Sequence, residues 1–315
     1  MDTRKEMDSL AIGLVTLTSF TWGLQQVLLK AVSADMSPVL QIAIRSGIAA
    51  ALLAAVMMYR QEKLFSDDTW KPGLMAGMLF ALEFFLVGEG LRHTTASHMI
   101  VFLYTAPIFV ALILHVKIKS ERLTPIQWLG ILVAFTGISI AFLWRDVQSS
   151  TPSAPNMLWG DLLALTAALF WALTTVLIRS SSLAKAPATQ TLLYQLVVCF
   201  IIVSFAAIAL GQTHYTLTTA VVSNLAFQGV VVTFGSLLLW FWLLRQYSAS
   251  QLGVFTFMTP LFGVLLSVWL LDEPFEEGFL YGAILVLLGI FMVSGHARIG
   301  GYLALLRNST ARIDR

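Results

Sequence analysis

An internal duplication constrains this chain more than any other feature of its sequence. The segment Phe20–Lys30 recurs as Leu169–Arg179, about 149 positions later. Other pairs recur at shifts of about 152 to 153 residues: Leu91–Ser97 with Leu244–Ser250, Thr105–Pro107 with Thr259–Pro260, and Glu121, Gly130 and Gly137 with Glu273, Gly282 and Gly289. The chain therefore holds two copies of one unit, over about residues 13–143 and 162–295.

The composition places both copies in a membrane. Hydrophobic residues make up 58% of the 315 residues and charged residues only 11%, with a mean hydropathy of +0.82, whereas soluble domains carry about 25% charged residues. Apolar stretches long enough to cross a ~30 Å hydrocarbon core occur at about 9–29, 38–58, 73–91, 95–115, 124–144, 158–178, 188–210, 222–244, 249–271 and 278–296. The sequence predicts an all-α integral membrane protein with ten transmembrane helices.

Each copy contains five of these spans, and five is an odd number. The second copy must then be inverted in the membrane relative to the first. Inverted repeats are typical of alternating-access transporters, which bind substrate near the bilayer midplane between the halves. We expect one five-helix repeat at 1–148, an inverted one at 149–298 and a tail at 299–315.

The distribution of positive charge sets the orientation. With the N-terminus in the cytoplasm, fifteen of the 19 Lys and Arg residues fall on the cytoplasmic side, Lys30, Arg92 and Arg145 fall outside, and Arg45 lies within a span. This excess matches the positive-inside rule. Both termini and the tail are therefore expected in the cytoplasm. The net charge of +2 then reflects topology and does not indicate nucleic-acid binding.

Several function classes lack their sequence signatures. The single cysteine, Cys199, excludes disulfides and thiolate metal sites. His93 and His98 sit five positions apart, on different faces of a helix, so we expect no metal site. The chain has no Gly-x-x-x-x-Gly-Lys-Ser/Thr and no His-Glu-x-x-His motif. We therefore expect no catalytic residues, no cofactor and no hydrolysis of ATP, and an intramembrane enzyme is the least favoured alternative.

Four motifs in order resemble one family. They are Trp22-Gly23 followed by Lys30, Arg45 in the second span, Ser120–Thr124 before the fifth and Leu271–Pro274 before the tenth. Together they resemble the drug/metabolite transporter superfamily, in its ten-helix EamA-type branch, over about residues 9–296. Within that branch the chain looks most like bacterial inner-membrane exporters of aromatic and other neutral amino acids. The resemblance implies that helices 1–4 and 6–9 surround a cavity, with helices 5 and 10 at the periphery.

Two ionisable residues lie well inside predicted spans. Arg45 and Glu83 are costly there unless paired or facing water, which makes them functional candidates. Arg45 is close enough in depth to pair with Glu83 or with Glu89. An Arg45–Glu83 pair is either a structural link between the second and third spans or part of a substrate site. Glu83 shares a helix face with Phe80 and Phe84, at spacings of three and four residues.

Aromatic and polar residues in the first and sixth spans are further candidates for the lining of a cavity. Trp22 and Trp171 occupy equivalent places near mid-span. Polar residues follow them three or four positions later, namely Gln25 and Gln26 in the first copy and Thr174 and Thr175 in the second. These residues either line a cavity or pack between helices. His98, near the external end of the fourth span, is expected to line a vestibule.

Pro107 and Pro260 fall near the middle of the fourth and ninth spans. Each removes a backbone donor and bends its helix. Because the two bends occupy equivalent places in the repeats, they are candidates for gating; a static kink is the alternative.

These features predict a secondary exporter of small amphipathic metabolites, most of all aromatic and other neutral amino acids. Its partners would be a small-molecule substrate and the lipid bilayer, and a monomer would suffice because one chain already contains both halves. A sugar-phosphate or organic anion antiporter of the same fold is the alternative. Phosphates require clustered Lys or Arg, and only Arg45 is expected to be buried.

Overall fold

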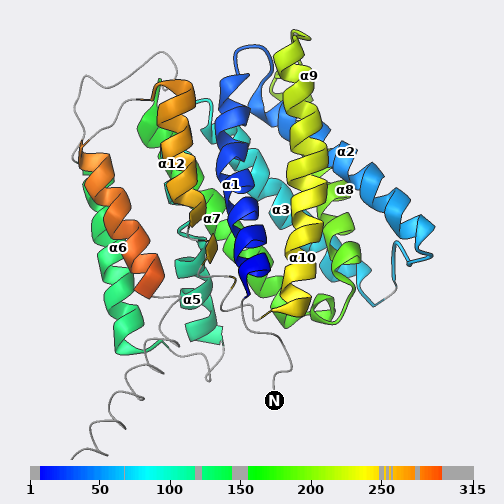
Figure 1. The fold of residues 1–315 in the computed structure, drawn as a ribbon, viewed down its shortest axis with the longest axis horizontal. Helices are drawn as coiled ribbons and strands as arrows, with labels where there is room; N and C mark the ends of the chain where they lie inside the picture. The colour runs from blue at the N-terminus through cyan, green and yellow to red at the C-terminus, as the bar shows by residue number, and fades with distance from the viewer. Residues whose placement is uncertain are drawn as a thin grey trace, which may run out of the picture.

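The structure, a computed structural model, describes residues 8–66, 68–117, 123–143, 155–247, 252, 255–256, 258–273 and 277–292. These residues form helices and their connections, with one isolated antiparallel bridge between Met36 and Tyr215. The helices stand side by side in one bundle (Figure 1). Their bounds are α1 Ser9–Ala31, α2 Pro38–Tyr59, α3 Trp70–Gly90, α4 Ala96–Leu103, α5 Ala106–Lys117, α6 Pro125–Leu143, α7 Met157–Ser180, η2 Ser182–Ala184, α8 Ala188–Ala209, α9 Thr219–Ala226, η3 Phe227–Ser236, α10 Leu237–Gln246 and α12 Met258–Leu271.

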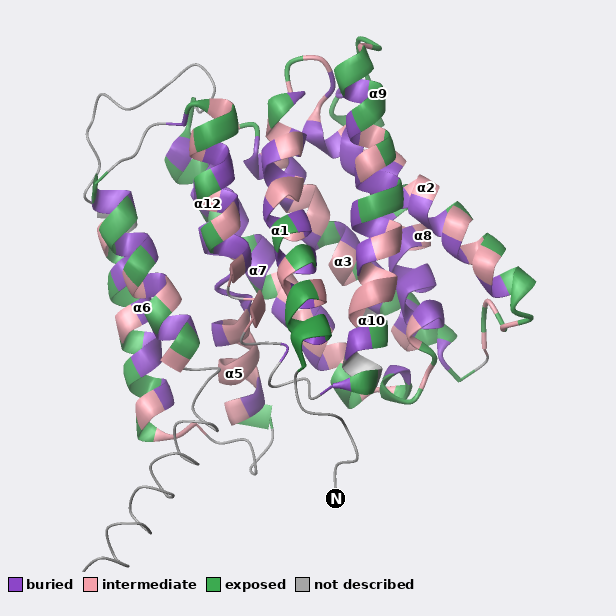
Figure 2. Cartoon of the chain, viewed as in Figure 1, coloured by how far each residue is buried: buried purple, intermediate pink, exposed green. Residues whose placement is uncertain are grey.

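Seven helical segments are long and apolar enough to cross a membrane: Ser9–Ala31, Pro38–Tyr59, Trp70–Gly90, Ala96–Lys117, Met157–Ser180, Ala188–Ala209 and Thr219–Trp240. Three shorter apolar helices, Pro125–Ile140, Met258–Leu271 and Glu277–Met292, overlap predicted spans. The helices combine buried and exposed faces (Figure 2), and large apolar side chains such as Phe205 and Trp269 are 72% and 76% exposed. The protein is an all-helical, multi-pass membrane protein.

Local sequence explains where several helices begin. The Asp8 carboxylate accepts a hydrogen bond from the Ala11 amide at 2.8 Å and so caps α1. Ser37 caps α2 in the same way, and Pro38 occupies the first turn, where its missing N–H costs nothing. These caps lie just outside apolar runs, so they fix where each span starts.

The fourth predicted span is broken rather than bent. α4 ends at Leu103, and α5 begins at Ala106 after the turn at Tyr104 and Thr105. Pro107 then occupies the first turn of α5, where proline is well tolerated. In the second copy, Pro260 lies in α12, and residues 255 and 256 before it are also helical. The helix is thus interrupted just before the first of these prolines.

The central packing joins the two copies of the sequence. α1 packs on α12, α2 on α8, and α3 on both α7 and α8. At one edge of the bundle α6 lies beside the orange helix Glu277–Met292 (Figure 1). A Cβ at Gly137 would lie 2.7 Å from the Val286 amide nitrogen, so glycine is needed for this close approach. These two helices are peripheral to the cavity described next.

Candidate functional site

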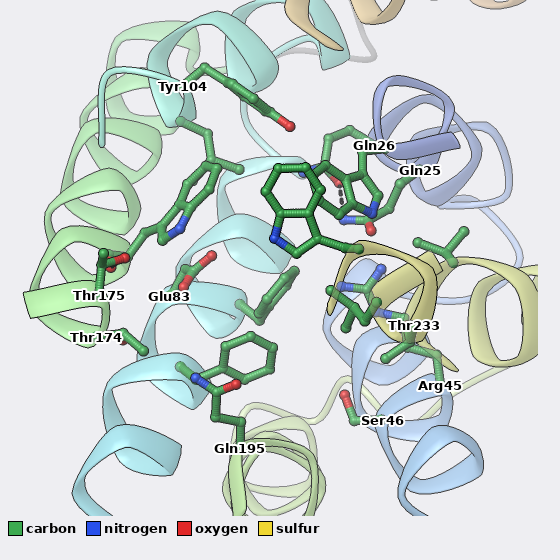
Figure 3. A pocket seen from close by; sticks show the side chains of 18 of the residues that line it. Gln25, Gln26, Arg45, Ser46, Glu83, Tyr104, Thr174, Thr175, Gln195 and Thr233 are labelled. Carbon is green, nitrogen blue, oxygen red and sulfur yellow. Dashed lines mark hydrogen bonds between the residues drawn. The ribbon is translucent and has the colours of Figure 1, made fainter. Parts of the chain in front are cut away.

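One cavity of about 250 Å³ lies where helices of both copies meet. Aromatic, polar and charged side chains from α1, α2, α3, α7, α8, α10 and neighbouring segments surround it (Figure 3). Seven of the eight predicted substrate-site residues line it: Trp22, Gln25, Phe80, Glu83, Phe84, Trp171 and Thr175. Arg45 joins them. A volume of this size with mixed lining suits a small amphipathic molecule.

Aromatic contacts fix the shape of the cavity. The Trp22 indole N–H donates to Ser236 Oγ at 2.8 Å, and the ring meets Trp240 edge-on at 5.3 Å between centroids. On the other side, Trp171 and Tyr104 meet at 5.3 Å with perpendicular rings. Such edge-to-face pairs restrict ring orientation, so the aromatic walls are held in place before a ligand enters.

The α3 face carries the expected stripe. Phe80 and Phe84 are one helical turn apart, and their ring centroids are 4.7 Å apart. Glu83 lies on the same face because three- and four-residue spacings bring side chains together on a helix. All three residues line the cavity.

Arg45 is held by a partner that the sequence did not indicate. Its side chain is buried, and Nη1 donates to Gln228 Oε1 at 2.8 Å. The guanidinium also lies 4.7 Å from the centroid of the Phe84 ring, a cation–π contact. Gln228 in turn donates from Nε2 to the Gln25 carbonyl at 2.8 Å. Arg45 is thereby tied to η3 and, through Gln228, to α1.

Glu83 is only 5% exposed, and its carboxyl group points into the cavity (Figure 3). Within the described part of the chain, no hydrogen bond and no ion pair within 4.0 Å reaches its oxygens. The predicted direct ion pair with Arg45 is therefore not formed here. The Arg45 guanidinium instead donates a hydrogen bond to Gln228. Arg45 and Glu83 lie on different sides of the cavity (Figure 3).

His98 does not line this cavity, contrary to the prediction that it faces a vestibule with the other site residues. It is buried, with Nδ1 3.0 Å from Asp161 Oδ2, and its ring stacks on Phe279 at 3.8 Å. Thr94 Oγ1 donates to the other oxygen of Asp161 at 2.5 Å. This α4–α7 contact holds two helices together outside the cavity.

Glu273 and Lys30 both bind backbone groups between the end of α3 and the first turn of α4. The Glu273 carboxylate accepts from the Ala96 amide at 2.6 Å, the Ser97 amide at 3.0 Å and Ser97 Oγ at 2.7 Å. It therefore caps α4, where unpaired amides favour a negative charge. Lys30 Nζ donates to the carbonyls of Leu91 and Thr94 at 2.5 and 2.8 Å, so Lys30 binds the backbone around the end of α3.

Sequence reasoning missed several lining residues. They are polar or aromatic side chains on helices whose cavity-facing side the sequence did not reveal: Ser46, Tyr104, Gln195, Thr233 and Trp240. Gln26 and Thr174, which the sequence placed in the same strips as Gln25 and Thr175, also line the cavity. Across the described residues, His, Cys, Asp and Glu form no group of three that could hold a metal ion.

Known proteins resemble this chain over the two segments of its internal repeat. The EamA-like transporter family matches residues 9–143 and 158–295. The uncharacterized transporter YoaV of Bacillus subtilis (strain 168) is 25% identical over 290 residues, covering 91% of this chain and 97% of that protein. An uncharacterized transporter of Archaeoglobus fulgidus is 27% identical over 281 residues, covering 89% and 96%. A solved crystal structure shares the fold, with a TM-score of 0.60 at 19% identity over 90% of this chain and 97% of that one.

Proposed function

The chain belongs to the EamA-like transporter family, and on that premise we propose that it exports small amphipathic metabolites, chiefly aromatic and other neutral amino acids, by alternating access. The cavity between the two copies carries this proposal. It combines aromatic walls, Glu83 on one side and Arg45 on another, in a volume of about 250 Å³. We place the protein in a bacterial inner membrane, as a functional monomer with both termini in the cytoplasm.

An aromatic amino acid fits the chemistry of this cavity. Its ring would stack on the indoles of Trp22 and Trp171, and its ammonium would approach Glu83. The alternative, a sugar-phosphate antiporter, needs several cations around the substrate. Among the described residues that line the cavity, Arg45 supplies the positive charge, and one of its donors is already bound to Gln228. The lining therefore favours the amino acid.

We further propose ten spans in two inverted five-helix repeats, 1–148 and 149–298. If a pseudo-twofold axis relates the two copies, each contact between the copies has a counterpart in which the equivalent helices have changed places. The first helix of the first copy, α1, packs on α12, and the first helix of the second copy, α7, packs on α4. Gly137 faces Gly282, and Gly289 faces Gly130. Because these are the residues that the sequence repeat equates, the exchanged contacts support the inverted arrangement.

Topology can be tested with two introduced cysteines in a Cys199→Ala background. Ser66 precedes α3, and Ser153 lies outside the described residues, before α7. We expect Ser66→Cys to react with a membrane-impermeant maleimide only after the cells are permeabilised, and Ser153→Cys to react in intact spheroplasts. Labelling of both cysteines from the same side of the membrane would overturn the inverted-repeat proposal.

The cavity proposal predicts the effects of three substitutions on transport. Glu83→Gln should weaken amino acid transport by about 1.5–3 kcal/mol, the scale of a hydrogen bond to a charged group. Trp22→Ala and Trp171→Ala should weaken it as well, because each removes an aromatic wall. Export of labelled phenylalanine from cells lacking related exporters measures the effect. Trp269→Ala, at a tryptophan 76% exposed on the outside of α12, is the matched control, and normal transport by all three cavity variants would remove the site.

The two prolines are proposed to act as bending points. Pro107→Ala and Pro260→Ala each restore a backbone donor and permit a straighter helix. We expect the rate of export to change several-fold while the substrate dissociation constant stays within about a factor of two. Export kinetics and equilibrium binding on the same purified variants separate these quantities. Unchanged rates and affinities in both variants would show that the bends are static.

A further inference from the structure

The Glu83 carboxyl group is buried, yet among the described residues no hydrogen bond and no ion pair within 4.0 Å reaches it. Its side chain is 5% exposed and points into the cavity. The nearby polar groups donate elsewhere: Trp22 donates to Ser236, Arg45 Nη1 donates to Gln228, and Thr175 Oγ1 donates to the Trp171 carbonyl. Arg45 Nε is a buried donor to which no described residue is hydrogen-bonded. An ionised carboxylate in such a place is unfavourable unless a cation or donor reaches it. The Glu83 carboxyl group is therefore available to a partner that enters the cavity.

The walls around Glu83 favour positive over negative charge. Phe80, Phe84, Trp22 and Trp171 present rings to the same cavity, and aromatic faces attract cations through their quadrupoles. Arg45 lies across the cavity with its guanidinium over Phe84 at 4.7 Å and one nitrogen bound to Gln228. Two chemical species could complete Glu83 within these walls, namely a proton on the carboxylate or an ammonium group beside it.

We propose that Glu83 binds either a proton or the ammonium group of the substrate, so that the cavity exchanges one proton for each organic amine it takes up. This inference rests on the proposed transport through the same cavity. The exchange is balanced: Glu83–COOH and R–NH₃⁺ give the pair Glu83–COO⁻···⁺H₃N–R and one H⁺, which leaves to the aqueous phase. No bond to carbon is made or broken, and no redox partner is needed.

The same geometry ranks substrate classes. Glu83 offers an acceptor with no hydrogen bond, whereas Arg45 already binds Gln228 through Nη1 and packs on Phe84, and keeps Nε as an unpaired donor. Because Glu83 requires a cation or a donor, the ammonium group is the required feature of the substrate, and a substrate carboxylate adds only a second contact, with Arg45. Aromatic amines and aromatic amino acids should both bind, and the corresponding deaminated acids should not.

Three indole probes differ only in these charged groups: tryptamine, tryptophan and indole-3-propionate. Binding to the purified full-length protein can be measured by calorimetry at pH 6 in two buffers of different ionisation enthalpy, which counts released protons. We expect tryptamine and tryptophan to bind with release of close to one proton. The apparent affinity for tryptamine should rise by up to about tenfold per pH unit as pH increases from 5.5, because proton and ammonium compete for one site. Indole-3-propionate should show no binding.

Two variants separate this inference from the proposed function. Glu83→Gln should lose proton release and the pH dependence of binding, while Glu83→Asp should keep both. Glu89→Gln is the matched control on the same helix, since Glu89 contacts Arg92 and Gln212 and does not line the cavity. If tryptophan binds the wild type without proton release, or if indole-3-propionate binds as well as tryptamine, the inference is overturned while the transport proposal stands. If none of the three probes binds, both fail.

Discussion

Replacing Glu273 with alanine should lower the free energy of unfolding by about 3–5 kcal/mol, the range seen when one partner of a buried charged interaction is removed. Glu273 is only 8% exposed. Its two oxygens satisfy the amides of Ala96 and Ser97 and the Ser97 hydroxyl, and the change leaves all three donors without that partner. Ser97 also contacts Ser267 of α12, so the loss should loosen the packing of α4 on α12.

Thermal unfolding in detergent measures this effect. Glu273→Gln should lie between the wild type and Glu273→Ala, because an amide oxygen can still accept one of the hydrogen bonds while its NH₂ group faces other donors. Arg92→Ala is the control: it also removes one partner of a charged contact, but Arg92 is exposed, and such pairs contribute little. If Glu273→Ala unfolds at the wild-type temperature, the carboxylate is not a structural cap.

The contrast between Glu273 and Glu83 shows what the sequence could and could not predict. Helical periodicity was enough to place Phe80, Glu83 and Phe84 on one face, because that depends only on residue spacing. The repeat placed Trp22 and Trp171 at equivalent depths. Glu273, by comparison, stood in a recognisable motif, but its partners lie 176 and 177 positions away. No local pattern reveals which backbone donors will be left unpaired beside it.

Two predictions about the site differ from the structure because they depended on contacts between residues far apart in the sequence. His98 was expected near the site because of its depth, but depth does not say which face of the helix meets Asp161, 63 positions later. The Arg45–Glu83 ion pair was expected because the two depths matched. Gln228 reaches Arg45 from a π-helical stretch, η3, whose backbone path differs from that of an α-helix. The direction in which each face points was decided by packing between distant helices.

The second large effect is expected at Gln228. Gln228→Leu should lower the free energy of unfolding by about 3–5 kcal/mol, because it removes the hydrogen-bond acceptor of a buried guanidinium. Gln228 is fully buried and contacts Arg45 at 2.8 Å. Arg45→Met should cost less, about 1–3 kcal/mol, since it leaves only a neutral amide oxygen without a donor. The ranking runs against the usual view that removing the charged residue is the more damaging change.

The double variant Arg45→Met with Gln228→Leu is the decisive comparison. It removes both polar partners together, so it should unfold at a higher temperature than Gln228→Leu alone, with a coupling energy of at least about 0.5 kcal/mol. Thermal unfolding of the four proteins completes the cycle. Additive losses would mean that Arg45 does not depend on Gln228. In that event Glu83 becomes the candidate partner of Arg45, and repeating the cycle with Glu83→Gln in place of Gln228→Leu would show the missing coupling.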